Sequence, residues 1–250
     1  ASPFIAWTGP PAGFDEQTAL HLLGGVSIPV ASGVRVGAEG YARRIDGLPV
    51  PIWSARTQFT LIPTEARSTS YGADARVEVQ RGPAYLYASY AYGVTEYSSV
   101  GGPFQVRGGE SYERYFPAHD RRHQLQMAAQ LDVGGFEIGA RWQFGSGLPY
   151  TRPFGFDVVV PPFGLPEVTT SPGFPRVVFE QPFNGRLPSY HRLDLTAGTE
   201  ISLGRAALDV QAGAINTYNR DNVFYYDVFR GRRVNQLPIV PYVSARLRTR

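Results

Sequence analysis

Four histidines are the residues of this sequence best suited to bind a metal ion: His21, His119, His123 and His191. His119 and His123 stand four residues apart, the spacing that two zinc ligands share on a helix. However, Asp120 follows His119 where the zinc-protease motif has glutamate, and the segment is predicted to begin a strand. Four extended residues span ~13 Å, too far for both rings to ligate one ion. We therefore expect no metal site and assign these histidines to ordinary hydrogen bonding.

Other catalytic motifs are also absent from the sequence. It contains no cysteine, which excludes disulfides and cysteine-ligated zinc. It contains no G-x-S-x-G, the motif that presents a nucleophilic serine. Gly33, Gly37 and Gly40 do not form the G-x-G-x-x-G fingerprint of dinucleotide binding. We expect no enzymatic activity and no cofactor.

Charged residues form the more informative pattern, because they recur at alternate positions of otherwise apolar segments. These positions are Arg76, Glu78, Glu137, Arg141, Arg192, Asp194, Glu200 and Asp209. Mixed signs on neighbouring strands favour cross-strand ion pairs that stabilise one wall. Alternatively, some of these charges hold a plug or line a substrate path. The sequence leaves both interpretations open.

The segments that carry these charges alternate with a period of two. In Phe136–Gly145, five apolar residues occupy one face and polar residues or glycine occupy the other. Similar alternation occurs over 73–80, 123–131, 192–202 and 207–216. A strand of ~9–11 residues is long enough to cross a bilayer at a tilt. These segments therefore predict strands with one apolar and one polar face.

About nine strands are predicted, joined alternately by short and long connections. They span about 18–28, 34–45, 70–80, 84–97, 121–131, 136–147, 190–202, 206–216 and 241–250, and the long connections span about 46–69, 98–120, 148–189 and 217–240. This alternation is typical of an outer-membrane barrel, in which the long connections are extracellular loops. A soluble β-sandwich or lipocalin-like barrel also alternates, but the many alanines at apolar positions suit a packed core poorly.

Composition excludes several other classes. Charged residues make up 18% of the 250 residues, below the ~25% of ordinary soluble domains. No apolar run approaches the ~18 residues of a membrane-spanning helix. The 13% aromatic content argues against disorder, and a net charge of +3 is too small to indicate nucleic-acid binding. The predicted fold is all-β, an antiparallel transmembrane β-barrel.

Strand parity suggests that this barrel is larger than nine strands. Bacterial single-chain barrels have an even number of strands and short periplasmic turns. Counted back from a final strand that ends in the periplasm, residues 1–17 would lie in an extracellular loop. We therefore expect the chain to supply about nine to ten C-terminal strands of a larger barrel, with upstream strands and any plug lying outside it.

Aromatic and arginine residues in the long connections are the candidate ligand-binding residues. They are Trp53, Arg56, Arg107, Tyr112, Tyr115, Phe116, Tyr150, Phe154 and Phe156. Such residues are enriched in recognition surfaces, although the rings could instead only pack the loops together. Two further pairs, Tyr90 with Tyr92 and Trp142 with Phe144, are predicted to lie at a similar level, as in the aromatic girdle of a membrane barrel.

Several segments resemble TonB-dependent outer-membrane receptors in their order along the chain. They are Thr8-Gly9-Pro10, Ala19–Gly25, Ser70-Tyr71-Gly72, Tyr90-Ala91-Tyr92, Asp120–His123, Trp142 with Ser146–Thr151, Arg186–Leu195 and Ile215–Asn222. The resemblance covers nearly the whole chain and concerns the C-terminal part of that family's 22-stranded type of barrel. It departs from the family in lacking the plug domain and in ending Leu247–Arg250 without an aromatic residue.

This resemblance implies a function in the bacterial outer membrane. The expected activity is receptor-mediated, TonB-energised uptake of a nutrient such as a siderophore, cobalamin or saccharide. The expected partners are outer-membrane lipid, a small-molecule or oligomeric nutrient, and TonB only through the absent plug; no nucleic-acid partner is expected. The alternatives are a plugless passive channel, a structural barrel component of a larger assembly, and a soluble β-barrel binding protein.

Overall fold

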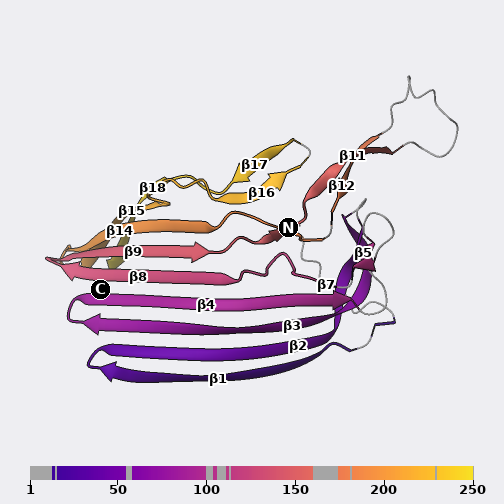
Figure 1. The fold of residues 1–250 in the computed structure, drawn as a ribbon. Coiled ribbons are helices and arrows are strands. Elements are labelled where there is room, and N and C mark those ends of the chain that lie inside the picture. The colour runs from indigo at the N-terminus through magenta and orange to yellow at the C-terminus, as the bar shows by residue number, and fades with distance from the viewer. Residues whose placement is uncertain are drawn as a thin grey trace.

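The computed structural model shows an all-β protein built around one large antiparallel sheet (Figure 1). It describes residues 13–14, 16–54, 58–99, 104–105, 111–112, 114–159, 174–180, 182–228 and 230–249. Within these residues there is no helix of the length and apolarity required to cross a membrane. The predicted all-β class is therefore confirmed, and the large antiparallel sheet agrees with the predicted strand order.

Nine long strands form the sheet, and each pairs with the one before it in the chain. They are β1 (Thr18–Ala31), β2 (Val34–Ser54), β3 (Gln58–Arg81), β4 (Ala84–Ser99), β8 (His123–Val133), β9 (Phe136–Gly145), β14 (Tyr190–Ser202), β15 (Ala206–Ile215) and β18 (Val240–Thr249). This up-and-down order agrees with the nine predicted strands. Four tight turns join the strands at one end, and glycines with positive φ, such as Gly33 and Gly82, occupy them.

Short strands occupy the connections at the opposite end of the sheet. They are β5 (Phe104–Gln105), β6 (Ser111–Tyr112), β7 (Arg114–Tyr115), β10 (Pro149–Tyr150), β11 (Pro153–Val159), β12 (Phe174–Phe179), β13 (Gly185–Arg186), β16 (Val223–Asp227) and β17 (Arg232–Asn235). β11 pairs with β12, and β16 with β17, as hairpins that extend beyond the sheet (Figure 1). We call this end of the molecule, opposite the tight turns, the rim. It comprises these connections and the ends of the long strands that they join.

One predicted connection is wrong. The segment 46–69 is not a loop, because β2 continues to Ser54 and β3 begins at Gln58. Prolines at 49, 51 and 63 obscured this ribbon, since proline cannot donate a ladder hydrogen bond. The structure accommodates Pro51 opposite Pro63, with register shifts at Ile45/Leu48 and Pro51/Trp53. Of the predicted entry loop 1–17, residues 1–12 and 15 lie outside the described residues.

The sheet curves, and its two edge strands stay apart. In Figure 1, β15 and β18 turn away from the viewer behind β8 and β9, so the face in view is convex. β1 pairs only with β2, and β18 only with β15, among the described residues. The structure is therefore an open, curved sheet, and closure into a barrel is not part of it.

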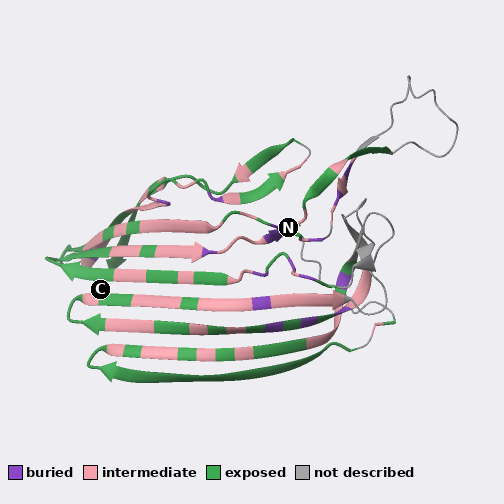
Figure 2. Cartoon of the chain, in the orientation of Figure 1, coloured by how far each residue is buried: buried purple, intermediate pink, exposed green. Residues whose placement is uncertain are grey.

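Buried side chains gather at the rim rather than in the sheet (Figure 2). Val50, Ala66, Tyr115, Val177 and Phe179 form the one described cluster of buried apolar residues, and all five belong to the strand ends or the long connections. By contrast, all fourteen residues of β1 are exposed. The sheet itself has no packed core on either side.

Candidate functional site

The register of the sheet gives it one continuous apolar face. We define the apolar face as the side of the sheet that carries Ala75 of β3, Ala129 of β8 and Leu195 of β14. The register of the paired strands identifies the residues of every other long strand that lie on the same side. Between the tight turns and the rim it consists of Leu22, Gly24, Val26, Ile28, Val34, Val36, Ala38, Gly40, Ala42, Tyr71, Ala73, Ala75, Val77, Val79, Leu86, Ala88, Tyr90, Tyr92, Val94, His123, Leu125, Met127, Ala129, Leu131, Val133, Phe136, Ile138, Ala140, Trp142, Phe144, His191, Leu193, Leu195, Ala197, Thr199, Ile201, Leu208, Val210, Ala212, Ala214, Pro241, Val243, Ala245 and Leu247. No Arg, Asp or Glu occurs in this set.

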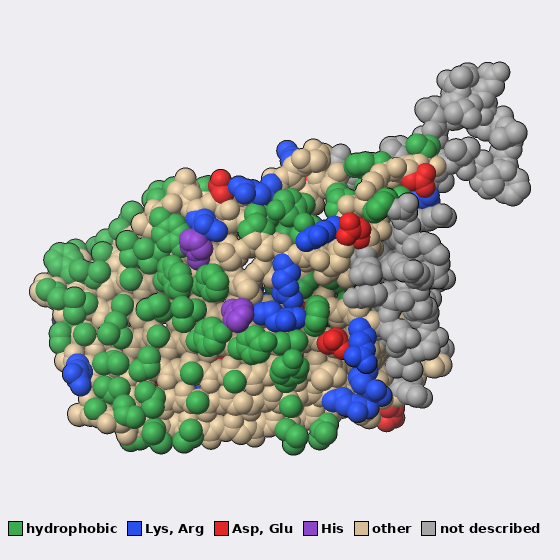
Figure 3. All heavy atoms as spheres, viewed as in Figure 1, with side chains coloured by type: hydrophobic (Ala, Val, Ile, Leu, Met, Phe, Trp, Pro, Cys, Tyr) green, Lys and Arg blue, Asp and Glu red, His purple; other side chains and the backbone are tan. Residues whose placement is uncertain are grey.

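Most of these side chains are exposed or half-exposed, and only Val94, at the rim end of β4, is buried. Phe136 is 56% exposed, Val243 77% and Leu22 62%. Figure 3 shows hydrophobic side chains spread over the convex face, with the histidines and most of the arginines on the side nearer the rim. A contiguous apolar surface of this extent is rare on a soluble monomer and marks a surface that contacts lipid or another apolar partner.

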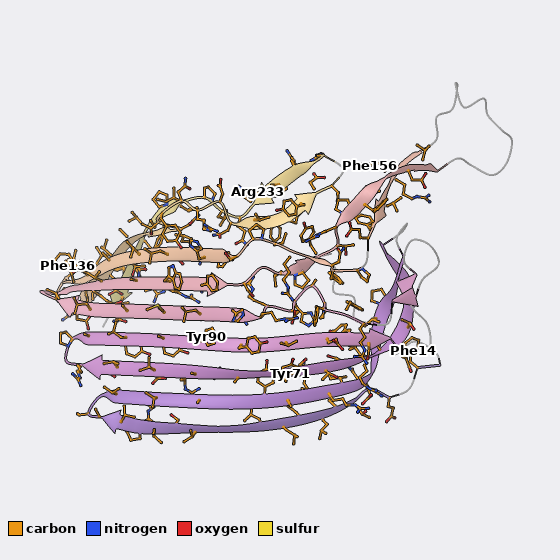
Figure 4. The ribbon with its side chains drawn as sticks, viewed as in Figure 1. Phe14, Tyr71, Tyr90, Phe136, Phe156 and Arg233 are labelled. Carbon is orange, nitrogen blue, oxygen red and sulfur yellow. The ribbon has the colours of Figure 1, made fainter. Side chains whose placement is uncertain are left out.

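Aromatic and imidazole rings border the apolar face on the rim side. In the sheet register, Tyr90 is opposite Leu125, Leu125 is opposite Phe144, and Phe144 is opposite His191. These side chains therefore lie in one row across the sheet. The predicted shared level of the Tyr90 and Phe144 pairs is therefore seen in the register. Tyr90 Oη lies 2.7 Å from Nδ1 of His123. Figure 4 shows Tyr71 and Tyr90 on the convex face, and Phe136 far from them beside a tight turn.

The opposite side of the same strands, which we call the polar face, carries all eight charged candidates. The register places Arg76, Glu78, Glu137, Arg141, Arg192, Asp194, Glu200 and Asp209 there together. Glu78 is opposite Arg35 on β2, and Arg141 is opposite Asp194 on β14. The sequence had suggested such cross-strand charge pairs, and they are arranged on the concave side of the sheet.

One group of ion pairs on the polar face lies at the tight-turn end, near β18, and a separate pair, Arg192 with Asp194 at 2.8 Å, lies nearer the rim. Arg248 lies 2.7 Å from Glu200 and 2.7 Å from Asp209. A hollow of about 600 Å³ lies here, and Glu137, Arg246 and Gln211 also line it. Arg246 and Arg248 had not been proposed from sequence, although their alternation with Ser244 gives the signal.

Close ring-to-glycine packing also occurs on the polar face. A Cβ atom at Gly72 would lie 2.8 Å from the Tyr41 ring, and one at Gly93 would lie 2.8 Å from its hydroxyl. The Tyr41 ring of β2 therefore covers Gly72 on the adjacent strand β3 and reaches Gly93 on β4. The same arrangement recurs where Tyr242 lies over Gly213. These glycines allow a large ring to lie flat against a sheet that has no other layer.

A buried carboxylate organises the rim between β4 and the 116–122 segment. The Asp120 side chain is 1% exposed and accepts hydrogen bonds from Arg122 Nε at 3.0 Å and from Arg186. Its other oxygen accepts from the backbone N–H of Thr95 at 2.8 Å. Arg122 also stacks over the Phe116 ring at 4.4 Å. This cluster joins three separate chain segments, and Asp120 had been named only for its place in a family-like motif.

A second carboxylate with two arginines lies where β2 and β3 leave the apolar face. Asp46 accepts from Arg44 Nε at 2.8 Å and from Arg67 Nε at 2.5 Å. The hydrogen bonds from Arg44 and Arg67 lower the pKa of Asp46 to about 2. Here the arginines are exposed, 52% for Arg44 and 44% for Arg67. Sequence reasoning missed this cluster, because it treated 46–69 as a loop.

Asn216 fixes the end of β15 in a similar way. It is fully buried, with φ of 54°, and its Nδ2 donates to the carbonyls of Arg220 at 2.9 Å and Leu237 at 3.1 Å. Its backbone N–H donates to Asp194 Oδ1 at 3.0 Å. Asparagine tolerates this left-handed conformation better than most residues. The bond to Asp194 connects the rim to the polar face.

The loop candidates whose side chains the structure describes do not lie together in one site. Tyr115 is buried and stacks on Phe183 at 5.5 Å, so it belongs to the loop core, and burial raises its pKa. Tyr150 contacts Tyr226 at 5.3 Å. Phe154 and Phe156 are exposed on β11, 54% and 68% (Figure 4). Arg56 and Arg107 lie outside the described residues, as do the side chains of Trp53 and Tyr112.

Metal binding and family membership receive no support from these observations. Among the described residues, no group of three or more His, Asp or Glu side chains is placed to hold a metal ion. The sequence matches no protein-family model and no curated protein. The arrangement of the two faces is therefore the main basis for a functional conclusion.

Proposed function

We propose that this chain forms part of a β-barrel in the bacterial outer membrane. The observation that carries the proposal is the division of nine antiparallel strands into a charge-free apolar face and a charged polar face. In a membrane barrel the apolar side contacts lipid and the polar side lines the interior. The convex curvature of the apolar side supports this orientation (Figure 3).

The height of the apolar face also supports the proposal. On β9 it runs from Phe136 to Phe144, eight steps of ~3.4 Å, or ~27 Å along the strand. A strand tilt of ~40° reduces this to ~21 Å, close to the ~25 Å band of outer-membrane barrels. Aromatic rings border it on the rim side, as they do in a membrane girdle.

The open edges indicate how such a barrel would be completed. The outer edges of β1 and β18 carry unpaired backbone groups among the described residues, and a lipid environment does not tolerate such edges. Further strands that pair with β1 and β18 would close the barrel. A barrel with more strands than these nine has a wider interior, and the polar face then lines a lumen wide enough for a plug or a solute.

Within this architecture we propose TonB-energised nutrient uptake as the activity. The family-like segments support it, since Asp120–His123 and Ile215–Asn222 form the buried hydrogen-bonded clusters of the rim. A plugless passive channel is the alternative, because the polar face would equally line an open pore.

Two measurements on the complete encoded protein separate these activities. Deleting the gene should abolish growth on one limiting nutrient among a ferric siderophore, cobalamin and a maltodextrin, and deleting tonB should give no further loss. Vesicles containing the purified protein should show no passive flux of small sugars. Rapid sugar flux, or growth on all three nutrients without the gene, would contradict the uptake proposal, and flux would favour the channel.

A further inference from the structure

Charged residues replace the uncharged residues of the apolar face where β2 and β3 reach the rim. From Ala42 to Val34 on β2 and from Tyr71 to Val79 on β3 the face has no charged residue. Towards the rim, Arg44 follows Ala42 on this face and Arg67 follows Thr69, and Asp46 joins the two arginines. Figure 3 shows arginine side chains gathered along this border of the hydrophobic surface. The border is therefore amphiphilic, with apolar surface on one side and positive charge on the other.

The Asp46 cluster keeps a positive charge and unused donors. Two guanidinium groups and one carboxylate leave a net charge of +1. The contacts with Asp46 use two donor nitrogens of Arg44 and one of Arg67, while each guanidinium has five N–H donors. With a pKa of about 2, Asp46 stays ionised and holds both arginines at every physiological pH. Exposed, pre-positioned guanidinium groups favour bidentate contacts with phosphate.

A shallow apolar groove crosses these two strands nearer the tight turns, and its lining extends from β1 to β8. It has a volume of about 450 Å³, with small side chains such as Ala38 and Ala75 at its base and larger ones such as Ile28, Tyr90 and Leu125 at its sides. Six residues separate Ala38 from Arg44, ~20 Å along the strand. That is about the length of an extended acyl chain, so a lipid with its headgroup at the arginines would reach the groove with the end of its acyl chain.

We propose that Arg44 and Arg67 bind the phosphate of an anionic membrane lipid whose acyl chain extends over the apolar face to the groove. The inference rests on the proposed function, in that it requires the apolar face to contact lipid. It does not extend to the Asp120 cluster. There Arg186 is committed to Asp120 and to the carbonyls of Asp120 and Gly147, and Arg122 is only 28% exposed.

The test measures lipid affinity in neutral maltoside micelles. Native mass spectrometry would titrate the full chain with phosphatidylglycerol and with phosphatidylcholine of the same acyl chains. One basic residue near an anionic surface contributes about a fivefold factor, so two contribute about 25-fold. The wild-type chain should therefore prefer phosphatidylglycerol. Arg67→Gln should weaken its binding about fivefold and the double variant Arg44→Gln/Arg67→Gln about 25-fold, with phosphatidylcholine binding unchanged.

A matched control removes the same charge from the other face. Arg35→Gln/Arg246→Gln changes two exposed arginines of the polar face and should leave phosphatidylglycerol affinity within twofold. Far-UV circular dichroism would establish that each variant keeps its strands. An equal loss in the control, or equal wild-type affinity for the two lipids, would overturn the lipid site while leaving the barrel proposal intact.

Two further outcomes separate the sources of error. Displacement of phosphatidylglycerol by millimolar inorganic phosphate would mean that the arginines bind free phosphate, and it would overturn the lipid assignment. Failure to bind either lipid and failure to enter phosphatidylcholine vesicles would instead contradict the proposed membrane location, and the lipid site with it.

Discussion

The sheet between its tight turns and the aromatic row differs from the rim in where it places apolar side chains. In the sheet, among the described residues, only Ala207 is buried, while Leu22 and Val243 are well exposed. The rim instead buries Tyr115, Val177 and Phe179, and most of its buried polar groups are hydrogen-bonded, with Nε of Arg176 and of Arg220 as the described exceptions (Figure 2). In the proposed membrane location, the sheet would contact lipid and the rim would contact water.

The strongest way to break this comparison is to place a charge on each side of one strand. Ala129 and Gln130 are adjacent on β8 and lie on opposite faces. Ala129→Arg should destabilise the folded state by ~2–4 kcal/mol in phosphatidylcholine vesicles, because it puts a charge near the bilayer centre. Gln130→Arg, on the polar face, should change the free energy of unfolding by less than ~0.5 kcal/mol. Urea unfolding in vesicles measures both, and equal losses would refute the assignment of the faces.

The second prediction compares the two arginine–aspartate clusters. Asp120→Asn leaves two half-buried guanidinium groups without their carboxylate and should cost ~2–3 kcal/mol of rim stability. Asp46→Asn disrupts an exposed, solvent-screened cluster and should leave stability nearly unchanged. Hydrogen exchange of the 116–122 amides reports the local stability. A larger loss for Asp46→Asn would show that burial does not determine the role of each cluster.

A smaller effect is expected from the ring-to-glycine packing on the polar face. Tyr41→Ala uncovers Gly72 and Gly93 and should lower stability by ~1 kcal/mol, the upper range for cross-strand pairs. Tyr85 lies on the same face, 37% exposed near a tight turn, and Tyr85→Ala serves as the control. The same urea titration compares them. Identical losses would mean that the glycines are not specific partners of Tyr41.

Alkaline pH should weaken the rim gradually and leave the sheet unaffected. Burial raises the pKa of Tyr115 above its usual value of 10.0. The unfolded rim therefore releases this proton first, so rim stability is complete below pH 10 and falls as pH rises further, by up to ~1.4 kcal/mol per unit. Limited proteolysis of the rim between pH 9 and 11 measures the trend. Tyr115→Phe should make the trend shallower, with a remainder from Tyr97, whose pKa burial also raises, and a trend as steep as that of the wild type would reject the explanation.

The sheet could be predicted from the sequence because its strands are governed by a single period. Phe136–Gly145 became β9 with the bounds that its alternation indicates. The ribbon beyond Asp46 could not be predicted from the sequence, because prolines and two register shifts interrupt the alternation. The polar-face candidates follow from the same period of two, and the register brings them together.

The rim could not be predicted because its contacts join distant segments. Arg186 reaches Asp120 across 66 positions of the chain, and Asn222 reaches His191 across 31. Nothing in the local pattern around Asp120 specifies these partners. The aromatic loop candidates failed as a single site for the same reason, since Tyr115 is buried in the loop core and Phe156 is exposed on a separate hairpin.

The central claim is tested most directly by measuring which solvent, lipid or water, each face of β8 contacts. The chain has no cysteine, so single cysteines at positions 124–131 can each carry a nitroxide spin label. In phosphatidylcholine vesicles, labels at 125, 127, 129 and 131 should be accessible to oxygen and protected from a water-soluble nickel complex. Labels at 124, 126, 128 and 130 should show the reverse. Equal accessibility of both series to nickel would contradict a lipid-facing apolar surface.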